Sequence, residues 1–297
     1  PTLTMLLDNS SSGSRDIELS YLTRGLSWRA DYVAELNATE DRINLKGWVT
    51  LVNKSGARYE KAKLQLVAGE VNQARPERFQ MRQKKATLMA AADSAPPKMK
   101  QESLLEYHLY TVQRPTTLKD NQSKQVALLK ENDGVCQKKL VLNSASPGYF
   151  WRKSGLIFKK KSVDVFLMLK NDKASNFGLP KPAGVIRVYK KDSAGMAQFV
   201  GEDKIRHTPE NETIELKLGR SFDVTADKRQ LDFAYLSHDT SRVRIYESEY
   251  EIKLKNAKAR AAVVDVKEYI PGEWKMLQQS SDHVKLSSSQ VKWQVKV

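Results

Sequence analysis

The chain reads WRADYVAEL at residues 28–36 and INLKGWVTL at residues 43–51, two runs in which apolar and polar side chains alternate. In a strand, successive side chains point to opposite faces, so a period of two is typical of a half-buried strand. The polar stretch at residues 37–42 has the composition of a turn. The two runs therefore predict the strands of an antiparallel hairpin with one buried face.

A second pattern recurs at three widely separated places. Each copy is an apolar strand that ends in Leu-x-Asn and passes into a turn containing Lys, and the three copies end at Asn53, Asn171 and Asn256. An Asn side chain can bond the backbone of its own turn and tolerates left-handed geometry, so it suits a strand end. The recurrence predicts a repeated β-sandwich plan of the immunoglobulin-like kind.

Strand patterns dominate the rest of the chain, from a first strand expected at residues 17–23 onward. The predicted fold class is all-β, with two immunoglobulin-like or β-sandwich units. A break rich in Ser, Pro and Gly predicts the boundary, with one unit at residues 1–146 and the other at residues 147–297. The segment 73–101 is rich in Ala and lacks alternation, which indicates one helical or disordered insertion.

The 297 residues carry a net charge of +15. A basic balance of this size favours nucleic acid, anionic lipid or acidic glycans as partners. Basic pairs are scattered, however, and acidic residues lie among them throughout. This patterning predicts solubility and affinity for an anionic envelope surface, and we expect no binding to nucleic acid.

The sequence also bears on the compartment. Its one cysteine, Cys136, excludes an intrachain disulfide and is expected to be a small core residue. No apolar run approaches the ~20 residues of a membrane-spanning helix. The first residue is Pro1, which is compatible with a signal peptide that has been removed.

Short motifs follow one another along the chain: LSYLT at 19–23, GLSWRADYV at 25–33, LQLVAGEVN at 64–72, EYHLY at 106–110, RPTT at 114–117, GLPKPAG at 178–184, GEDKI at 201–205 and LKLG at 216–219. Together they resemble the bacterial domain-of-unknown-function 4139 family, to whose neighbourhood mucoidy inhibitor A-like proteins belong. The resemblance covers nearly the whole chain. It implies an exported or envelope-associated β-rich protein and brings no catalytic residues.

The chain departs from that family in two respects. Family members often carry a further strand after the segment that matches residues 291–297, so this strand set is expected to be clipped. The coiled coil and the small N-terminal domain of mucoidy inhibitor-like relatives have no counterpart in the sequence.

Patterns that mark catalytic or metal sites are missing from the sequence. The four histidines stand isolated, without the spacing of metal ligands. Neighbours in Ser237-His238-Asp239 would point to opposite faces of a strand, as would Glu202-Asp203, so neither run can converge on a substrate. The loop at residues 178–184 resembles a phosphate loop, but Pro180 and Pro182 lack amide donors, which favours a rigid connection.

The first candidate for a ligand surface is the aromatic and basic run Tyr149, Phe150, Trp151, Arg152 and Lys153. Rings beside cations can stack on a sugar or dock a partner. The alternative is that the rings pack and close one end of a sandwich.

The sequence thus predicts a non-catalytic, exported or envelope-associated β-sandwich protein that acts by binding or assembly, without a cofactor or metal. The expected partners are an acidic glycan, an anionic envelope surface or another protein, in the periplasm, at the outer membrane or outside the cell. The alternative is a hydrolase of cell-wall or surface polymers whose catalytic residues converge only in three dimensions.

Overall fold

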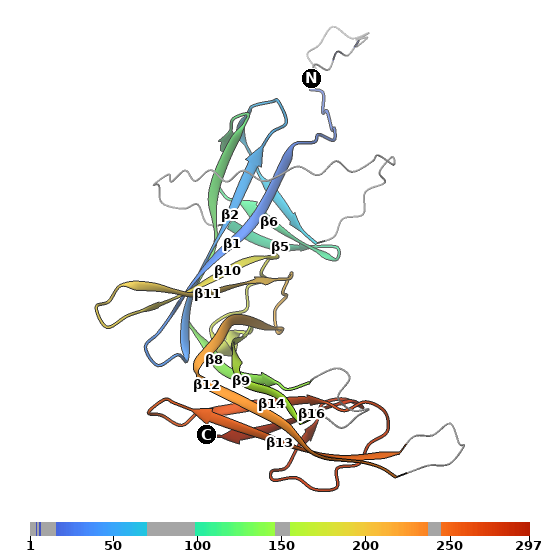
Figure 1. Cartoon of the computed structure of the whole chain (residues 1–297). Helices are drawn as coiled ribbons and strands as arrows, with labels where there is room; N and C mark the ends of the chain where they lie inside the picture. The colour runs from blue at the N-terminus through green and yellow to red at the C-terminus, as the bar shows by residue number, and fades with distance from the viewer. Residues whose placement is uncertain (1–3, 5, 7–15, 70–98, 146–154, 237–244) are drawn as a thin grey trace.

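A computed structural model describes residues 4, 6, 16–69, 99–145, 155–236 and 245–297 (Figure 1). Strands account for 64% of these residues, and none of the described residues lies in an α-helix. Globular proteins average about one third helix, so the prediction of an all-β chain is confirmed.

The strands in chain order are β1 (Leu26–Leu36), β2 (Arg42–Asn53), β3 (Tyr59–Ala62), β4 (Gln65–Ala68), β5 (Met99–Leu104), β6 (Tyr107–Val112), β7 (Thr116–Leu118), β8 (Gln122–Asn143), β9 (Leu156–Lys170), β10 (Gly184–Lys191), β11 (Ala197–Ile205), β12 (Thr213–Tyr235), β13 (Tyr246–Asn256), β14 (Val263–Tyr269), β15 (Val284–Lys285) and β16 (Gln290–Lys296). A 3₁₀ turn, η2 (Lys173–Ser175), lies between β9 and β10.

The predicted N-terminal hairpin is confirmed. β1 and β2 pair antiparallel. Along most of both strands, buried positions alternate with half-buried or exposed ones. Tyr32 stands opposite Gly47, and a Cβ atom at Gly47 would lie 2.9 Å from the Tyr32 ring. Glycine at this position therefore leaves room for a fully buried tyrosine ring.

Eleven strands form one mixed sheet, in the order β11-β10-β1-β2-β8-β14-β16-β15, with β9, β12 and β13 attached beside this path. The long strand β8 connects the two ends of the molecule, because its first part pairs with β2 and its last part pairs with β9 and β14. Two small sheets, β3-β7 and β4-β6-β5, lie outside it. The layout is thus one large mixed sheet, which does not clearly divide into the two immunoglobulin-like sandwiches that the sequence predicted.

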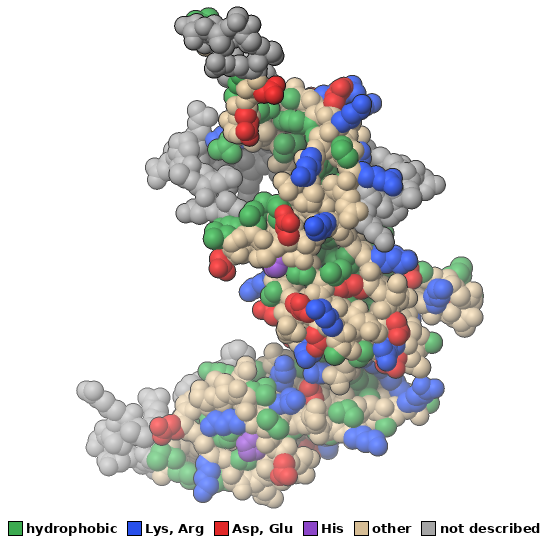
Figure 2. All heavy atoms as spheres, turned by 180° about the vertical axis from the view of Figure 1, so that it is seen from behind, with side chains coloured by type: hydrophobic (Ala, Val, Ile, Leu, Met, Phe, Trp, Pro, Cys, Tyr) green, Lys and Arg blue, Asp and Glu red, His purple; other side chains and the backbone are tan. Residues whose placement is uncertain are grey.

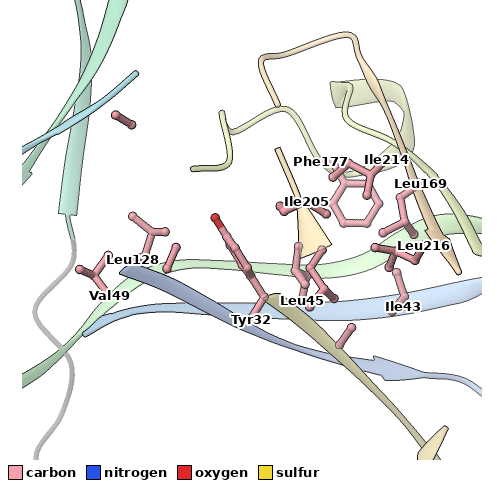
Figure 3. Packing of buried hydrophobic residues seen from close by; sticks show 14 of the residues in the cluster. Tyr32, Ile43, Leu45, Val49, Leu128, Leu169, Phe177, Ile205, Ile214 and Leu216 are labelled. Carbon is pink, nitrogen blue, oxygen red and sulfur yellow. The ribbon is translucent and has the colours of Figure 1, made fainter. Parts of the chain in front are cut away.

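Two clusters of buried apolar side chains lie along this sheet. The first is the larger, and Figure 3 shows part of it around Tyr32, Phe177 and Leu216. The second consists of Leu140, Leu142, Val163, Val224, Ala226, Val264 and Val266. Strands β8, β9 and β12 contribute residues to both clusters. The predicted boundary between residues 146 and 147 lies outside the described residues and stays a prediction.

The strand predicted at residues 17–23 is wrong. These residues form no strand, and Ile17, Leu19 and Tyr21 are exposed. Alternating apolar residues make a strand only where a neighbouring strand supplies hydrogen bonds. Pairing between β1 and β2 begins at Leu26, beyond this segment.

The predicted insertion at residues 73–101 is only partly described. Residues 73–98 lie outside the described part of the chain. Met99 opens β5, which pairs antiparallel with β6. Residues 99–101 are therefore strand, and the expectation of a helix or disorder is wrong for them, because they complete the edge of a three-stranded sheet.

The repeated Asn residues close their strands as predicted. The Oδ1 atom of Asn53 accepts a hydrogen bond from the amide of Ser55 at 3.0 Å, and that of Asn256 accepts one from the amide of Lys258 at 3.0 Å. Both are turns in which a side chain replaces a backbone acceptor. The Oδ1 atom of the third copy, Asn171, accepts its backbone hydrogen bond from a residue farther along the chain, outside its own turn.

Candidate functional site

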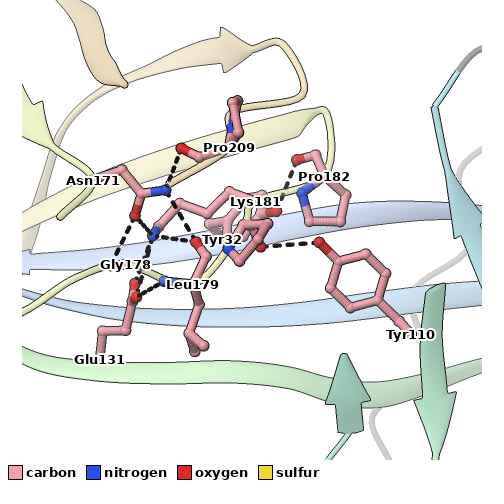
Figure 4. A network of polar contacts seen from close by, with 10 residues as sticks. Tyr32, Tyr110, Glu131, Asn171, Gly178, Leu179, Lys181, Pro182 and Pro209 are labelled. Carbon is pink, nitrogen blue, oxygen red and sulfur yellow. Dashed lines mark hydrogen bonds and ion pairs between the residues drawn. The ribbon is translucent and has the colours of Figure 1, made fainter. Parts of the chain in front are cut away.

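A buried ion pair holds the loop at residues 178–184 against β8. Lys181 is 1% exposed in its side chain, and its Nζ atom lies 2.9 Å from Oε2 of Glu131 (Figure 4). The same ammonium donates hydrogen bonds to Oε1 of Glu131 at 3.2 Å, to Oδ1 of Asn171 at 2.6 Å and to the carbonyl of Leu179 at 3.1 Å. All three ammonium protons therefore have acceptors, as a buried charge requires.

Two buried tyrosines fix the same loop from the opposite side. The Tyr32 hydroxyl donates to the carbonyl of Pro182 at 2.8 Å, and the Tyr110 hydroxyl donates to that of Pro180 at 3.0 Å. Burial raises the pKa of both hydroxyls well above the usual tyrosine range. The loop is thus a fixed connection, in agreement with the interpretation drawn from its two prolines.

Burial also acts on the charge of Lys181. Desolvation lowers the pKa of its ammonium, and the neighbouring Glu131 carboxylate opposes that shift. The ammonium is enclosed and fully bonded, so this network stabilises the fold and offers no group to a ligand.

A second buried ion pair lies in the other half of the sheet. Nζ of Lys228 is 2.5 Å from Oε2 of Glu268 and donates to the carbonyl of Ser144 at 3.1 Å. The Ser144 hydroxyl also donates to this carboxylate. Oε1 of Glu268 is buried and has no hydrogen-bond partner in the structure as described. The pair fixes the end of β8 against β12 and β14.

A cavity of about 230 Å³, which we call the junction cavity, lies at the same end of β8. It is lined by Asn143, Ala145, Lys161, Ser162, Asp164 and Arg220. These residues come from the end of β8, from β9 and from β12, the three strands that serve both buried clusters.

Positive charge exceeds negative charge around the junction cavity. Lys217 lies 2.9 Å from the Asp164 carboxylate and Arg220 lies 3.6 Å from it, so two cations share one acid. The Lys161 ammonium donates to the carbonyl of Asn143 at 2.7 Å. Burial lowers the pKa of Lys161, Asp164 opposes that shift, and the charge of Lys228 adds to it. An anion that enters the cavity would offset this excess of positive charge.

An irregular pairing of β12 shapes the cavity. The register between β9 and β12 shifts between Arg220 and Thr225. Oγ of Ser221 accepts a hydrogen bond from the amide of Val224 at 3.1 Å and so holds the distortion. At its tip, Phe222 is 95% exposed. Bulges of this kind redirect side chains and are frequent beside binding sites.

The predicted ligand surface, Tyr149 to Lys153, lies outside the described residues and stays a prediction. The described chain resumes at Gly155 and stops at Ala145, which lines the junction cavity. The triplet Ser237-His238-Asp239 also lies outside the described residues. Glu202 and Asp203 diverge as expected, because Glu202 pairs with Arg187 and Asp203 accepts the amide of Lys217.

The described histidines are not gathered into one group: His108 and His207 line a common cavity, described below, and His283 lies elsewhere. His108 is on β6, His207 follows β11, and His283 contacts Gln279 near the C-terminus. In the described ranges, no group of three or more His, Cys, Asp or Glu side chains is arranged to hold a metal ion. Cys136 is buried, as expected for a core residue.

The surface and the helix content bear on possible partners. Figure 2 shows Lys and Arg side chains spread over one face with acidic side chains between them, and they do not merge into one continuous basic patch. Throughout residues 16–69, 99–145, 155–236 and 245–297, no helix is long and apolar enough to cross a membrane.

Sequence reasoning missed the residues that organise both sites, Glu131, Lys228 and Glu268. The sequence does contain a signal for Lys228 and Glu268. Lys228 occupies the inward phase of Val224 and Ala226, and Glu268 continues the buried phase of β14. Two charges of opposite sign at inward positions of two strands indicate a buried pair.

Comparisons with known proteins give one match. The family model described as "Domain of unknown function (DUF4139)" matches residues 17–294. No curated protein and no solved structure shows a significant match to the chain.

Proposed function

The chain belongs to the DUF4139 family, and from this premise we propose that it is a non-catalytic binding or assembly module of the bacterial cell envelope. The proposal places it in the periplasm, at the outer membrane or outside the cell. We also propose that the chain has two sandwich-like units, one built around each cluster of buried apolar side chains. The observation that carries the proposal is the cationic junction cavity formed by β8, β9 and β12.

The ligand class follows from the side chains of that cavity. Arg220 reaches Asp164 only at 3.6 Å, and its side chain is 75% exposed, so its guanidinium can take a second acid. A guanidinium binds a carboxylate or phosphate through two parallel hydrogen bonds. Lys161 adds a second positive charge beside it. We therefore propose an anionic group, carried by an acidic glycan or by a lipid head group.

The predicted surface at Tyr149 to Lys153 belongs to the same proposal. The described residues nearest to it in the sequence are Ala145, which lines the cavity, and Gly155. Aromatic rings are of the kind that packs on the uncharged face of a sugar. The net charge of +15 would steer such a ligand toward the protein and make binding weaken with salt.

The test compares two double variants with the same change in net charge. Lys161→Gln/Arg220→Gln removes both cations of the cavity, whereas Arg42→Gln/Lys46→Gln removes two exposed cations of β2. Binding is measured by calorimetry with a uronic-acid oligosaccharide and, separately, with phosphatidylglycerol vesicles. We expect the first variant to bind one of these probes at least tenfold more weakly and the second to bind it within twofold of the unaltered chain.

Each other outcome has a defined meaning. Equal losses in both variants would show that net charge alone drives binding and would overturn the cavity as the site. Retention by the first variant together with loss in Phe150→Ala/Trp151→Ala would move the site to the predicted surface. Shortened oligosaccharide products, seen by chromatography after incubation, would replace the binding proposal with the hydrolase alternative.

A further inference from the structure

A second cavity, of about 270 Å³, lies against the other buried cluster, beside the fixed loop. Three parts of the chain form it: β4 and β6 of the small sheet, the loop itself, and the segment after β11. Its lining consists of Ala68, Gly69, Glu106, His108, Tyr110, Pro180, Lys181, Pro182, His207, Thr208 and Pro209. We call it the loop cavity. It shares no residue with the junction cavity and does not depend on it.

The wall of the loop cavity is preformed. The backbones of Lys181 and Thr208 exchange two hydrogen bonds of 2.9 Å, which joins the loop to the segment after β11. Tyr110 is bonded to the carbonyl of Pro180, which joins the loop to β6. Prolines restrict the remaining backbone freedom. A rigid, largely apolar wall with a few polar groups is typical of a small-molecule site.

The polar groups of the cavity include two imidazoles, each with a hydrogen-bond partner at Nδ1. Nδ1 of His108 lies 2.8 Å from the amide nitrogen Nε2 of Gln101, which can only donate. Nδ1 of His207 accepts the backbone amide of Ala183 at 3.2 Å. Because both Nδ1 atoms accept, the hydrogen of each neutral ring is on Nε2. Both rings therefore present an Nε2–H donor.

Glu106 also lines the cavity and is a potential carboxylate acceptor, but the lysine of the cavity is already engaged. The Lys181 ammonium is buried and bonded to Glu131 and Asn171 behind the wall. Among the described residues that line the cavity, Lys181 is the only Lys or Arg, so a bound anion would meet the charge of Glu106 without an available cation among them. A ligand with hydroxyl groups suits the two donors and the acceptor, and its C–H face suits the Tyr110 ring and the prolines.

We propose that the loop cavity binds a single neutral sugar ring. Two imidazole donors and one carboxylate acceptor would bond its hydroxyl groups, and the apolar wall would pack on its face. The volume of about 270 Å³ is just below the range of pockets for drug-sized ligands, which suits one ring. The protein would then bind a neutral sugar at this site, in addition to the anionic group proposed for the junction cavity.

The test uses methyl glycosides of neutral hexoses and of a uronic acid as probes, with binding measured by saturation-transfer NMR. The chain has four histidines, so the ring protons also report the position of a ligand. We expect a neutral hexoside to bind with a millimolar Kd and to shift the signals of His108 and His207 but not those of His283. Tighter binding of the uronic acid would overturn the neutral class.

The matched variants are His108→Leu/His207→Leu, which removes both Nε2–H donors, and His283→Leu, which removes a distant imidazole. We expect the first to raise the Kd at least tenfold and the second to leave it within twofold. No saturation transfer from any neutral hexoside to the unaltered chain would overturn the proposal, as would full binding by a folded double variant. If the double variant fails to fold, the histidine shifts of the unaltered chain decide the question.

Discussion

The Nζ atom of Lys181 lies 2.9 Å from Oε2 of Glu131, and the two side chains are 1% and 6% exposed. This contact joins a loop to the strand at the centre of the sheet. A buried ion pair is strongly destabilised when one partner is removed, because the other charge stays in a site without water. Replacing both partners with apolar residues avoids that cost.

We therefore expect Lys181→Met to lower the free energy of unfolding by about 3–5 kcal/mol. The double variant Lys181→Met/Glu131→Leu should recover a large part of this loss. Urea unfolding at neutral pH measures both effects. The control is Lys46→Met, which breaks an exposed pair with Glu35 and should stay within about 1 kcal/mol of the unaltered chain. A double variant that is less stable than Lys181→Met would contradict the unpaired-charge explanation.

Alkaline pH should destabilise the chain through Tyr32. Burial, with a smaller contribution from the neighbouring Tyr110, raises the pKa of the Tyr32 hydroxyl above its usual value. A raised pKa means that the folded state keeps a proton that the unfolded state releases above about pH 10. The stabilisation is therefore present below that pH and is lost as the pH rises further.

Tyr32→Phe tests this linkage. At pH 7 the variant should lose about 1 kcal/mol, because the carbonyl of Pro182 loses its donor. Between pH 9 and pH 11 its stability should fall less steeply than that of the unaltered chain, as measured by urea unfolding at a series of pH values. Tyr189→Phe, at a half-buried position on β10, is the control. Parallel pH profiles for Tyr32→Phe and the unaltered chain would exclude Tyr32 as the group responsible.

Cys136 should be chemically inert in the folded chain. Burial raises the pKa of its thiol to about 11, and the negative charges of Asp41 and Glu40 contribute in the same direction. The thiolate is the reactive form. At pH 8, labelling with a disulfide reagent should therefore be slow without urea and complete within minutes in unfolding urea. Rapid labelling of the folded chain would show that β8 opens locally at this residue.

Local patterns predicted much of the fold correctly. The hairpin from Trp28 to Leu51 follows from a period of two, and Asn53 and Asn256 close their strands as Asn residues at strand ends should. Residues 17–23 show the limit of this reasoning, since they alternate in the same way and form no strand. Alternation shows that a segment is able to pair, but the pairing itself depends on residues far away in the chain.

The sheet layout and the junction cavity could not be predicted for the same reason. β8 leaves β2 after Val135, joins β9 at Cys136 and joins β14 at Leu140, and nothing in its alternation marks these changes of partner. Arg220 meets Asp164 only because β12 pairs with β9, which places the two residues opposite each other. Cavities of this kind are made by tertiary pairing, which a sequence pattern does not contain.

The close approach of Gly134 and Phe177 gives the last prediction. A Cβ atom on Gly134 would lie 2.1 Å from Cζ of the Phe177 ring, which is buried in the first cluster. Gly134 does not have positive φ, so alanine introduces a clash without backbone strain. We expect Gly134→Ala to lower the free energy of unfolding by about 1–3 kcal/mol, as overpacking does.

In Gly134→Ala/Phe177→Leu the smaller side chain should make room, so the double variant should be more stable than the sum of the single effects predicts. Gly155→Ala is the matched control, because no atom of the described residues, its chain neighbours aside, lies within 4 Å of its Cβ position. Chemical denaturation of Gly134→Ala, Phe177→Leu, their double variant and Gly155→Ala measures the coupling between the two positions. Strict additivity of the two single effects would show that the Phe177 ring moves aside without cost.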